Sequence, residues 1–347
     1  PQAYDAPAVR QDTGAAQTAL ATDDKGTLDL GGYQNVDCIR ARDGLVYAAA
    51  CDGAALKKCS SDLVRTDGGH TAAVLTVDGE LTGFAFDGSG DLWLSILTPG
   101  GGSLCRAAHD SWGTAVEQVV TQIDGAPLGA VSAVEAAPDG RIYFAVAAAA
   151  GAADGLESTL RTELLAHTGT GWVYVYDPAA RSVQKVLGGV AGAAGLALSP
   201  DGSTLYVSDL ANRCVWRVSA DAQDLTAGGK NCSSLVSGLP GYPGALAMDP
   251  DGTLYIGYRW ARSSWLEKNA GSTLLRGIAL RAGRNLQEKL FSLPADAPCT
   301  EAVDTADGSW QRVVSGRGAG SVTALCPVES RLYLGLAGSE KVRSANL

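Results

Sequence analysis

The side chains that most often carry hydrolytic or metal chemistry are sparse in this sequence. Its three histidines, His70, His109 and His167, are far apart and show neither the HxH nor the HExxH spacing of zinc sites. The GxSxG motif of serine hydrolases does not occur, and the glycines of HTGTGW are not followed by the GKS or GKT of a phosphate-binding loop. We therefore expect no metal, no cofactor and no serine nucleophile.

Cysteine is the reactive residue type that is well represented. The chain has eight cysteines, an even number, and none of them forms a CxxC pair. This usage favours disulfides in a secreted, lumenal or cell-surface protein, with buried free thiols as the alternative. Cys51 and Cys59 flank a turn that a disulfide could close, and Cys214 and Cys232 could join two strands. The pairing stays open, and the other candidates are Cys38, Cys105, Cys299 and Cys326.

Composition sets the class of protein. The chain has 347 residues, of which 46% are hydrophobic, 18% are charged and 44 are glycines, so a large core and many tight turns are expected. The net charge of -10 disfavours a nucleic-acid partner. Because no run of about 18 apolar residues occurs, we expect membrane attachment only through an anchor that is not present in this chain.

One strand signal recurs six times and predicts the scaffold. Each copy is a polar turn, often Asp-Gly, followed by an aromatic residue among aliphatic ones. The aromatic residues are Tyr47, Trp93, Tyr143, Tyr206, Tyr255 and Tyr333. Their spacing is typical of four-stranded propeller blades with two longer insertions. We predict an all-β, six-bladed β-propeller over residues 28–347, preceded by an N-terminal extension over residues 1–27.

The two insertions should place further side chains over one mouth of the propeller channel. Residues 147–168 are rich in alanine and then compatible with a helix through STLRTELLAH, and residues 259–275 contain RWARSSWLEK, which is also compatible with a short helix. The candidate rim residues are His167, Arg259, Trp260, Arg262 and Trp265. Each could instead only pack its insertion onto the propeller.

Three stretches resemble, in order, the strictosidine synthase-like family. They contain GWVYVYDP with LSPDG, then LPGYPGALAMDPDG, and finally SVTALCPVESRLYLG. The family includes the adipocyte plasma membrane-associated protein and is related to the paraoxonase and gluconolactonase propellers. The resemblance covers roughly residues 30–345, and it implies a six-bladed propeller.

The resemblance also implies a channel site that this sequence largely lacks. Hydrolases of the family hold calcium with a first-blade Glu, which falls on Asp37, and with Asn or Asp side chains of later blades. Those later positions hold Ser132 and Ala133, Ala194 and Gly195, and Pro243, Gly244 and Ala245. The acid/base Glu of the synthase falls on Thr323, and a threonine hydroxyl cannot replace it without an activating base.

These substitutions lead to two hypotheses. The main one is a binding module without catalytic residues, which contacts an unknown protein or small-molecule ligand through the loops of one face. The alternative is an ester or lactone hydrolase with a rearranged site built from Asp37, Ser132, Thr323 or the rim residues. An amine-condensing synthase is the least favoured reading.

Overall fold

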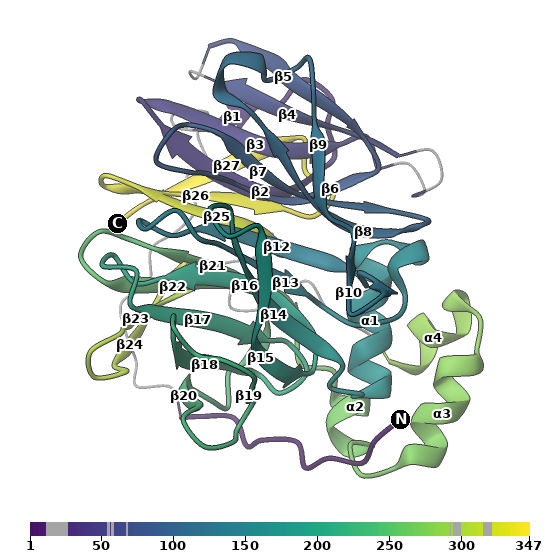
Figure 1. Ribbon diagram of the computed structural model, residues 1–347. Coiled ribbons are helices and arrows are strands. Elements are labelled where there is room, and N and C mark those ends of the chain that lie inside the picture. The colour runs from purple at the N-terminus through teal and green to yellow at the C-terminus, as the bar shows by residue number, and fades with distance from the viewer. Residues whose placement is uncertain are drawn as a thin grey trace.

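The described chain of the computed structural model (Figure 1) forms six mainly antiparallel sheets of four or five strands, the blades, and one further two-stranded sheet of β10 (Gln122–Ile123) and β11 (Ala126–Pro127). The structure describes residues 1–11, 27–53, 56, 59–66, 69–291, 293, 300–314 and 321–347. The predicted six-bladed β-propeller is confirmed. None of the described helices is long and apolar enough to cross a membrane.

The first three blades follow the chain in order. Blade 1 contains β2 (Asn35–Arg42), β3 (Leu45–Cys51), β4 (Ser60–Thr66) and β5 (Thr71–Asp78). Blade 2 contains β6 (Glu80–Phe86), β7 (Leu92–Thr98), β8 (Gly101–Ala107) and β9 (Glu117–Val120). Blade 3 contains β12 (Val131–Ala136), β13 (Ile142–Val146), β14 (Gly171–Asp177), β15 (Ser182–Val190) and, parallel to β15, β19 (Leu225–Thr226).

The last blade closes the ring with strands from both ends of the chain. Blade 4 contains β16 (Ala193–Leu198), β17 (Thr204–Asp209), β18 (Cys214–Ser219) and β20 (Ser233–Val236). Blade 5 contains β21 (Gly241–Met248), β22 (Thr253–Ala261), β23 (Thr300–Asp304) and β24 (Trp310–Val314). Blade 6 contains β25 (Val322–Val328), β26 (Arg331–Leu336), β27 (Lys341–Asn346) and, as its outermost strand, β1 (Leu28–Asp29).

The recurring sequence signal marks the second strand of every blade. All six predicted aromatic residues lie on those strands, from Tyr47 on β3 to Tyr333 on β26. The first turn shows why Asp-Gly recurs: Asp43 and Gly44 have φ values of 52° and 76°, so both adopt the left-handed conformation of a tight hairpin turn. Buried apolar side chains fill the space between neighbouring blades, as Val173 of blade 3 and Val207 of blade 4 do.

Helices occur on one side of the blades, at the right of Figure 1. The insertion after β13 forms α1 (Leu156–Ala166), as its sequence predicted. The insertion after β22 forms α2 (Ser264–Lys268), α3 (Thr273–Arg281) and α4 (Arg284–Leu290). Two sequence expectations need correction here, because Arg259 and Trp260 belong to β22, and because the helical region extends beyond residue 275.

The first part of the N-terminal extension lies across these helices. Backbone N–H groups of Gln2 and Tyr4 donate to the carbonyl oxygens of Ala166 and Ala270 at 2.8 and 3.4 Å. Further along, the Arg10 N–H donates to the Gly238 carbonyl oxygen at 2.9 Å. We call residues 1–11 the N-terminal strap. It connects the end of α1 to blades 4 and 5.

Candidate functional site

The channel wall is a ring of bulged residues, one position from each inner strand. In all six blades the register between the first and second strands shifts, at one place in five blades and at two places in blade 5, which leaves residues there unpaired. A β-bulge of this kind changes the direction of a side chain, which then no longer follows the alternation between the two faces of the sheet. The ring residues that line the channel are Asp37, Thr82, Ser132, Ala194, Ala245 and Thr323. Asp37, Ser132 and Thr323 were predicted to face the channel, and the structure brings all three together.

The hydroxyl groups of the ring connect one blade to the next. Thr82 donates to the Val131 carbonyl oxygen at 3.0 Å, and Ser132 donates to the Ala193 carbonyl oxygen at 2.7 Å. Thr323 donates in the same way to the carbonyl oxygen of Val36. Each acceptor immediately precedes the ring position of the following blade. These hydroxyls therefore connect neighbouring blades, including Ser132, where the resemblance implied a metal ligand, and Thr323, where it implied the acid/base Glu.

The ring does not fit the calcium ion that the resemblance implied. Calcium prefers six to eight oxygen ligands, several of them carboxylates, and the ring contains one carboxylate, Asp37. Within the described ranges, no group of three or more His, Cys, Asp or Glu side chains is placed to hold a metal ion. Asp37 instead forms an ion pair with a cation of the protein itself, Arg259.

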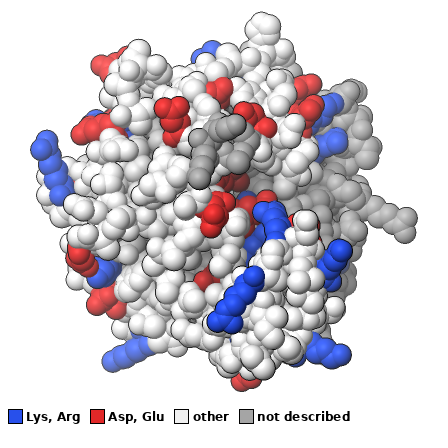
Figure 2. Space-filling view, turned by 90° about the vertical axis from the view of Figure 1, so that its right-hand side faces the viewer, with Lys and Arg blue, Asp and Glu red and all other residues white. Residues whose placement is uncertain are grey.

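A chamber of about 130 Å³ lies next to the ring, on the helical side. It is lined by Asn35, Asp37, Cys51, Gly53, Leu56, Cys59, Glu80, Gly155, Leu156, Glu157, Arg259, Thr323 and Ala337. Figure 2 looks onto the helical side, where acidic side chains gather around a central hollow and basic side chains border it from below. The chamber thus combines three carboxylates with one guanidinium.

Arg259 and Asp37 form the floor of the chamber. The Arg259 Nη2 atom lies 3.5 Å from Asp37 Oδ1, and the two side chains are 8% and 10% exposed. Burial raises the pKa of Asp37, and the nearby Arg259 opposes this effect. Among the described residues, Asp37 is the one ion-pair partner of Arg259, and Arg259 both forms this ion pair and lines the chamber.

Glu80 is the second carboxylate of the chamber and has no arginine of its own among the described residues. Its Oε2 accepts a hydrogen bond from the backbone N–H of Leu156 at 3.0 Å, at the start of α1. Gly155 makes this approach possible, because a Cβ atom there would lie 3.1 Å from the same oxygen. Burial, followed by repulsion from Asp37, raises the pKa of Glu80 to about 7. Glu80 can therefore both accept and release a proton near neutral pH.

The rest of the channel is narrow and ends at a second ion pair. The space within the ring amounts to about 30 Å³, room for very few water molecules. Beyond it, Arg40 donates to Glu135 and, at 3.3 Å, to the Val134 carbonyl oxygen. A wider cavity of about 330 Å³ opens at that end, lined by Arg40, Glu135 and mainly apolar residues. Burial raises the pKa of Glu135, and Arg40 opposes the rise.

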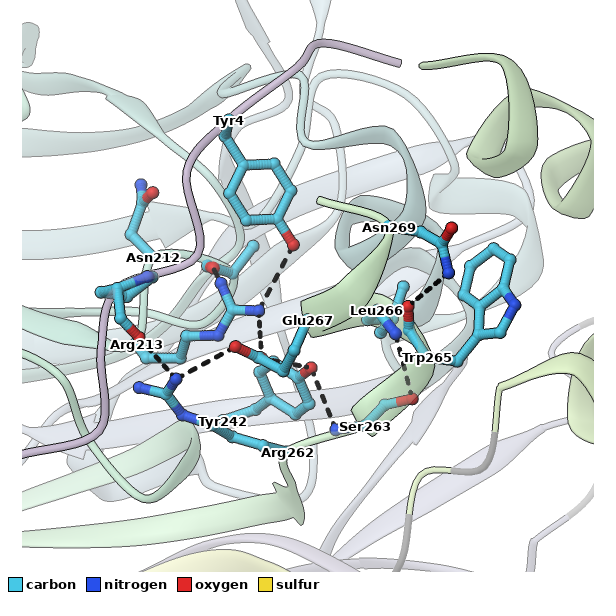
Figure 3. A network of polar contacts seen from close by, with 12 residues as sticks. Tyr4, Asn212, Arg213, Tyr242, Arg262, Ser263, Trp265, Leu266, Glu267 and Asn269 are labelled. Carbon is cyan, nitrogen blue, oxygen red and sulfur yellow. Dashed lines mark hydrogen bonds and ion pairs between the residues drawn. The ribbon is translucent and has the colours of Figure 1, made fainter. Parts of the chain in front are cut away.

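Of the predicted rim residues, only Arg259 reaches the chamber. Arg262 belongs to a separate network, shown in Figure 3, in which Glu267 accepts from Arg213 at 2.5 Å and from Arg262 at 3.1 Å. The Tyr4 hydroxyl of the N-terminal strap accepts from Arg213 at 3.3 Å in the same network. These side chains attach α2 and the strap to blade 4.

The remaining rim candidates also pack the insertions. His167 ends α1 with its ring stacked 3.7 Å from that of Tyr4, and burial lowers its pKa to about 4. Trp260 is buried in the largest apolar cluster, and Trp265 packs against that cluster. For these residues the packing alternative describes the structure better than a role at the mouth.

The seven cysteines in the described part of the chain are free thiols, and all are buried. The predicted disulfides are therefore not formed in this structure, and Cys299 lies outside the described residues. Cys51 and Cys59, the pair expected to close a turn, are neighbours in the chamber wall. The disulfide pairing stays a prediction.

Sequence reasoning missed Glu80 and Glu157. Glu80 is the first residue of β6, at the start of the inner strand LTGFAF, and an acidic residue at that position was a usable signal. Glu157 comes from α1, and only the folded insertion brings it to the channel mouth. Its side chain also pairs with Arg284 of α4 at 3.2 Å.

Fold and site together define a six-bladed propeller whose channel ring is closed by hydrogen bonds and whose acidic chamber lies under helices. Comparison with known families gives a match over residues 110–264 to the SMP-30/Gluconolactonase/LRE-like region, which is less than half of the chain. The likeness thus lies with gluconolactonase-type propellers, and the narrower strictosidine synthase-like assignment is not shown. None of the curated proteins matches the chain.

Solved structures share the whole architecture at low sequence identity. A gluconolactonase from Xanthomonas campestris is 16% identical with a TM-score of 0.61, covering 100% of this chain and 98% of its own. Regucalcin from Agrobacterium tumefaciens, a calcium-binding protein, is 14% identical with a TM-score of 0.58, covering 96% and 95%. A PQQ-bound aldose sugar dehydrogenase from Streptomyces coelicolor is 12% identical with a TM-score of 0.54, covering 92% and 97%. Likeness at this level shows the fold alone.

Proposed function

We propose that this protein hydrolyses a small, uncharged lactone or ester in the chamber beside the channel ring. The observation that carries the proposal is the placement of Glu80, whose pKa is raised to about 7, in the same buried chamber as Arg259. A carboxylate that gains and loses its proton near neutral pH is suited to general acid/base catalysis. A guanidinium beside it is suited to stabilising negative charge that develops on a carbonyl oxygen.

The residues of the chamber can divide the reaction between them. In its deprotonated form Glu80 takes a proton from a water molecule, which attacks the carbonyl carbon of the lactone. Negative charge develops on the carbonyl oxygen, where the Arg259 guanidinium stabilises it. When the ring C–O bond breaks, protonated Glu80 returns the proton to the leaving oxygen. The product is a hydroxy acid, whose carboxylic acid group releases its proton to solvent to become a carboxylate, and Glu80 is again deprotonated.

Asp37 acts through Arg259. Its carboxylate holds the guanidinium at 3.5 Å and keeps the net charge of the chamber negative together with Glu80 and Glu157. Because of this negative charge we expect a neutral substrate to bind better than an anion. The carboxylate product is repelled by the same groups, which favours its release.

The comparisons support this proposal over the non-catalytic reading that the sequence favoured. The matched region carries the gluconolactonase name, and one solved structure of similar fold is a gluconolactonase. We therefore propose sugar lactones as the first substrate class to test. The proposed reaction uses no metal ion, because the ring residues do not fit one.

The test is a pH-stat assay on a panel of five- and six-membered lactones and aryl esters, with EDTA present. We expect turnover of at least one neutral lactone, and we expect Glu80→Gln to lower kcat/KM by about 100-fold or more. The matched control is Glu135→Gln, which changes a buried carboxylate at the other end of the channel and should leave kcat/KM within about threefold of wild type.

Two outcomes would contradict the proposal. The first is that folded protein turns over none of the compounds in the panel. This result would favour the hypothesis that the propeller is a binding module without catalytic residues. The second is turnover that Glu80→Gln leaves unchanged, which would place the chemistry elsewhere.

A further inference from the structure

Two cysteines form part of the chamber wall, and the proposed hydrolysis does not use them. Cys51 is the last residue of β3, and Cys59 immediately precedes β4. Both line the chamber that contains Asp37 and Glu80. Their residue exposures are 7% and 8%, so each contacts the cavity while the rest of its surface is covered.

The two cysteines lie at the same end of the β3–β4 hairpin. Cys51 is paired with Ser61 in the strand register, and the Cys59 sulfur lies 3.8 Å from the Ser61 hydroxyl and donates to the Gly79 carbonyl oxygen at 3.5 Å. Asn35 Nδ2 lies 3.8 Å from the Cys51 sulfur. Two thiols at one end of a hairpin that line the same cavity need little movement to form a disulfide.

The surroundings distinguish the two thiols chemically. A hydrogen bond from Cys51, together with one from Ser61, lowers the pKa of Cys59, although burial and the nearby Glu80 and Asp52 carboxylates oppose this. The same hydrogen bond and burial raise the pKa of Cys51. Thiolates are the reactive form of cysteine, so Cys59 is the better nucleophile and Cys51 the resolving partner.

Cys105 and Cys38 contact oxygen atoms of other residues and serve as a comparison. Cys105 is 1% exposed, and its sulfur lies 3.3 Å from the Ser103 hydroxyl. Cys38 donates to the Phe84 carbonyl oxygen at 3.5 Å. Burial raises the pKa of both thiols.

We propose that Cys51 and Cys59 form a redox-active dithiol in the chamber wall, which a small, neutral disulfide such as 2-hydroxyethyl disulfide converts reversibly to an intramolecular disulfide. The Cys59 thiolate attacks one sulfur of 2-hydroxyethyl disulfide and releases the first 2-mercaptoethanol thiolate. Cys51, after losing its proton to solvent, attacks the Cys59 sulfur and releases the second. Two cysteine thiols are oxidised, and one 2-hydroxyethyl disulfide is reduced to two thiols.

The first test uses the unaltered protein, so it does not depend on whether a variant folds. The folded protein is treated briefly with iodoacetamide at pH 7.5, and alkylation of each cysteine is followed by peptide mass spectrometry. We expect Cys59 to react at least about tenfold faster than Cys105. Equal rates at the two positions would overturn the assignment of Cys59 as the nucleophile.

The second test identifies the disulfide. The protein is equilibrated in mixtures of 2-mercaptoethanol and 2-hydroxyethyl disulfide, and the bridged peptides are mapped. We expect one bridge joining Cys51 to Cys59, reversed by excess 2-mercaptoethanol. Cys105→Ser should behave as wild type, whereas Cys51→Ser should stop at the mixed disulfide of Cys59 with 2-mercaptoethanol.

A bridge at another pair, such as Cys214 with Cys232, or the absence of any bridge in the folded protein, would overturn the proposal. These readouts are independent of hydrolysis. The dithiol proposal can therefore be confirmed or rejected independently of the proposed hydrolysis.

Discussion

The two ends of the channel carry similar ion pairs, but the helical end has two further carboxylates, Glu80 and Glu157. At the helical end Asp37 pairs with Arg259, and at the opposite end Glu135 pairs with Arg40. Only the helical end adds Glu80, which accepts one backbone N–H and has its pKa raised to about 7. The opposite cavity is larger, about 330 Å³ against about 130 Å³, yet its lining is mainly apolar apart from the pair itself.

This difference shows that an ion pair in a cavity is not by itself evidence of a catalytic site. A paired carboxylate is held in one charge state by its partner, whereas a buried carboxylate without an arginine can change charge near neutral pH. The volume of a cavity is a poorer guide to a catalytic site than the presence of a carboxylate without an ion pair within it. The following predictions test this difference between the two ends of the channel.

Removing one arginine from each end should give the largest effects. Arg259→Met and Arg40→Met each leave a carboxylate buried without its partner, which we expect to cost about 3 to 5 kcal/mol in the free energy of unfolding. Urea denaturation measures this loss. Only Arg259→Met should also abolish hydrolysis by the protein that remains folded.

A double variant separates the two roles of Arg259. Asp37→Asn combined with Arg259→Met removes both charges, so most of the stability should return while hydrolysis stays lost. Recovery of hydrolysis in the double variant would contradict the role given to Arg259.

The next largest effect should be the contribution of Glu80 to the change of the free energy of unfolding with pH. Its pKa is raised in the folded state from 4.5 to about 7. The folded protein therefore binds more protons than the unfolded chain between these values, and stability should fall as pH rises through this window, by up to about 3 kcal/mol. Burial raises the pKa of Asp37 in the same direction, while Arg259 opposes the shift at both carboxylates.

Melting temperatures of wild type and Glu80→Gln between pH 4 and pH 8 measure this contribution. The wild type should lose more stability toward pH 8 than Glu80→Gln does. In the same range, kcat/KM of the wild type should rise with an apparent pKa near 7. Parallel stability curves for the two proteins would show that Glu80 has an ordinary pKa.

The hydrogen bonds of the ring should have a smaller effect. Ser132→Ala removes the donor to the Ala193 carbonyl oxygen, which we expect to cost about 1 to 2 kcal/mol. Hydrolysis should change by less than about threefold, because Ser132 lies in the narrow part of the channel and does not line the chamber. Loss of activity without loss of stability would instead assign Ser132 to the chemistry.

Metal removal should have the smallest effect. Because the ring does not fit calcium, melting temperatures in excess calcium and in EDTA should agree within about 1 °C. A stabilising, stoichiometric calcium ion would contradict our description of the ring and would make the helical end a metal site like that of other propellers.

The sequence predicted the repeating parts of the molecule well. The Asp-Gly turns and aromatic strand residues, such as Asp43 and Tyr47, depend on local backbone preferences that each blade repeats. Asp37, Ser132 and Thr323 could be placed in the channel because the family resemblance aligned each of them with an expected channel position on an inner strand. Their bulges, which make them face the channel, were not evident from residue types.

The chamber could not be predicted to the same degree. Glu80 acquires its raised pKa from burial, from Asp37 and from the start of α1, which lies 76 residues away along the chain. Arg259 was assigned to an insertion helix, although its strand extends to Ala261. His167 and Arg262 were expected at the mouth, but the N-terminal strap covers them, and nothing in the sequence of the strap indicated that contact.

The pairing of both ends of the chain fixes an order for biosynthesis. β1 needs β27, with Leu28 opposite Val342, and the strap needs residues as late as Glu301, which pairs with Arg10. While the ribosome makes the chain, the first thirty or so residues emerge long before any of their partners exist. Blade 6 can close only after β27 has left the ribosome, so a nascent chain that stops before β27 cannot complete the ring. A closed ring therefore requires that translation has passed the last strand of blade 6.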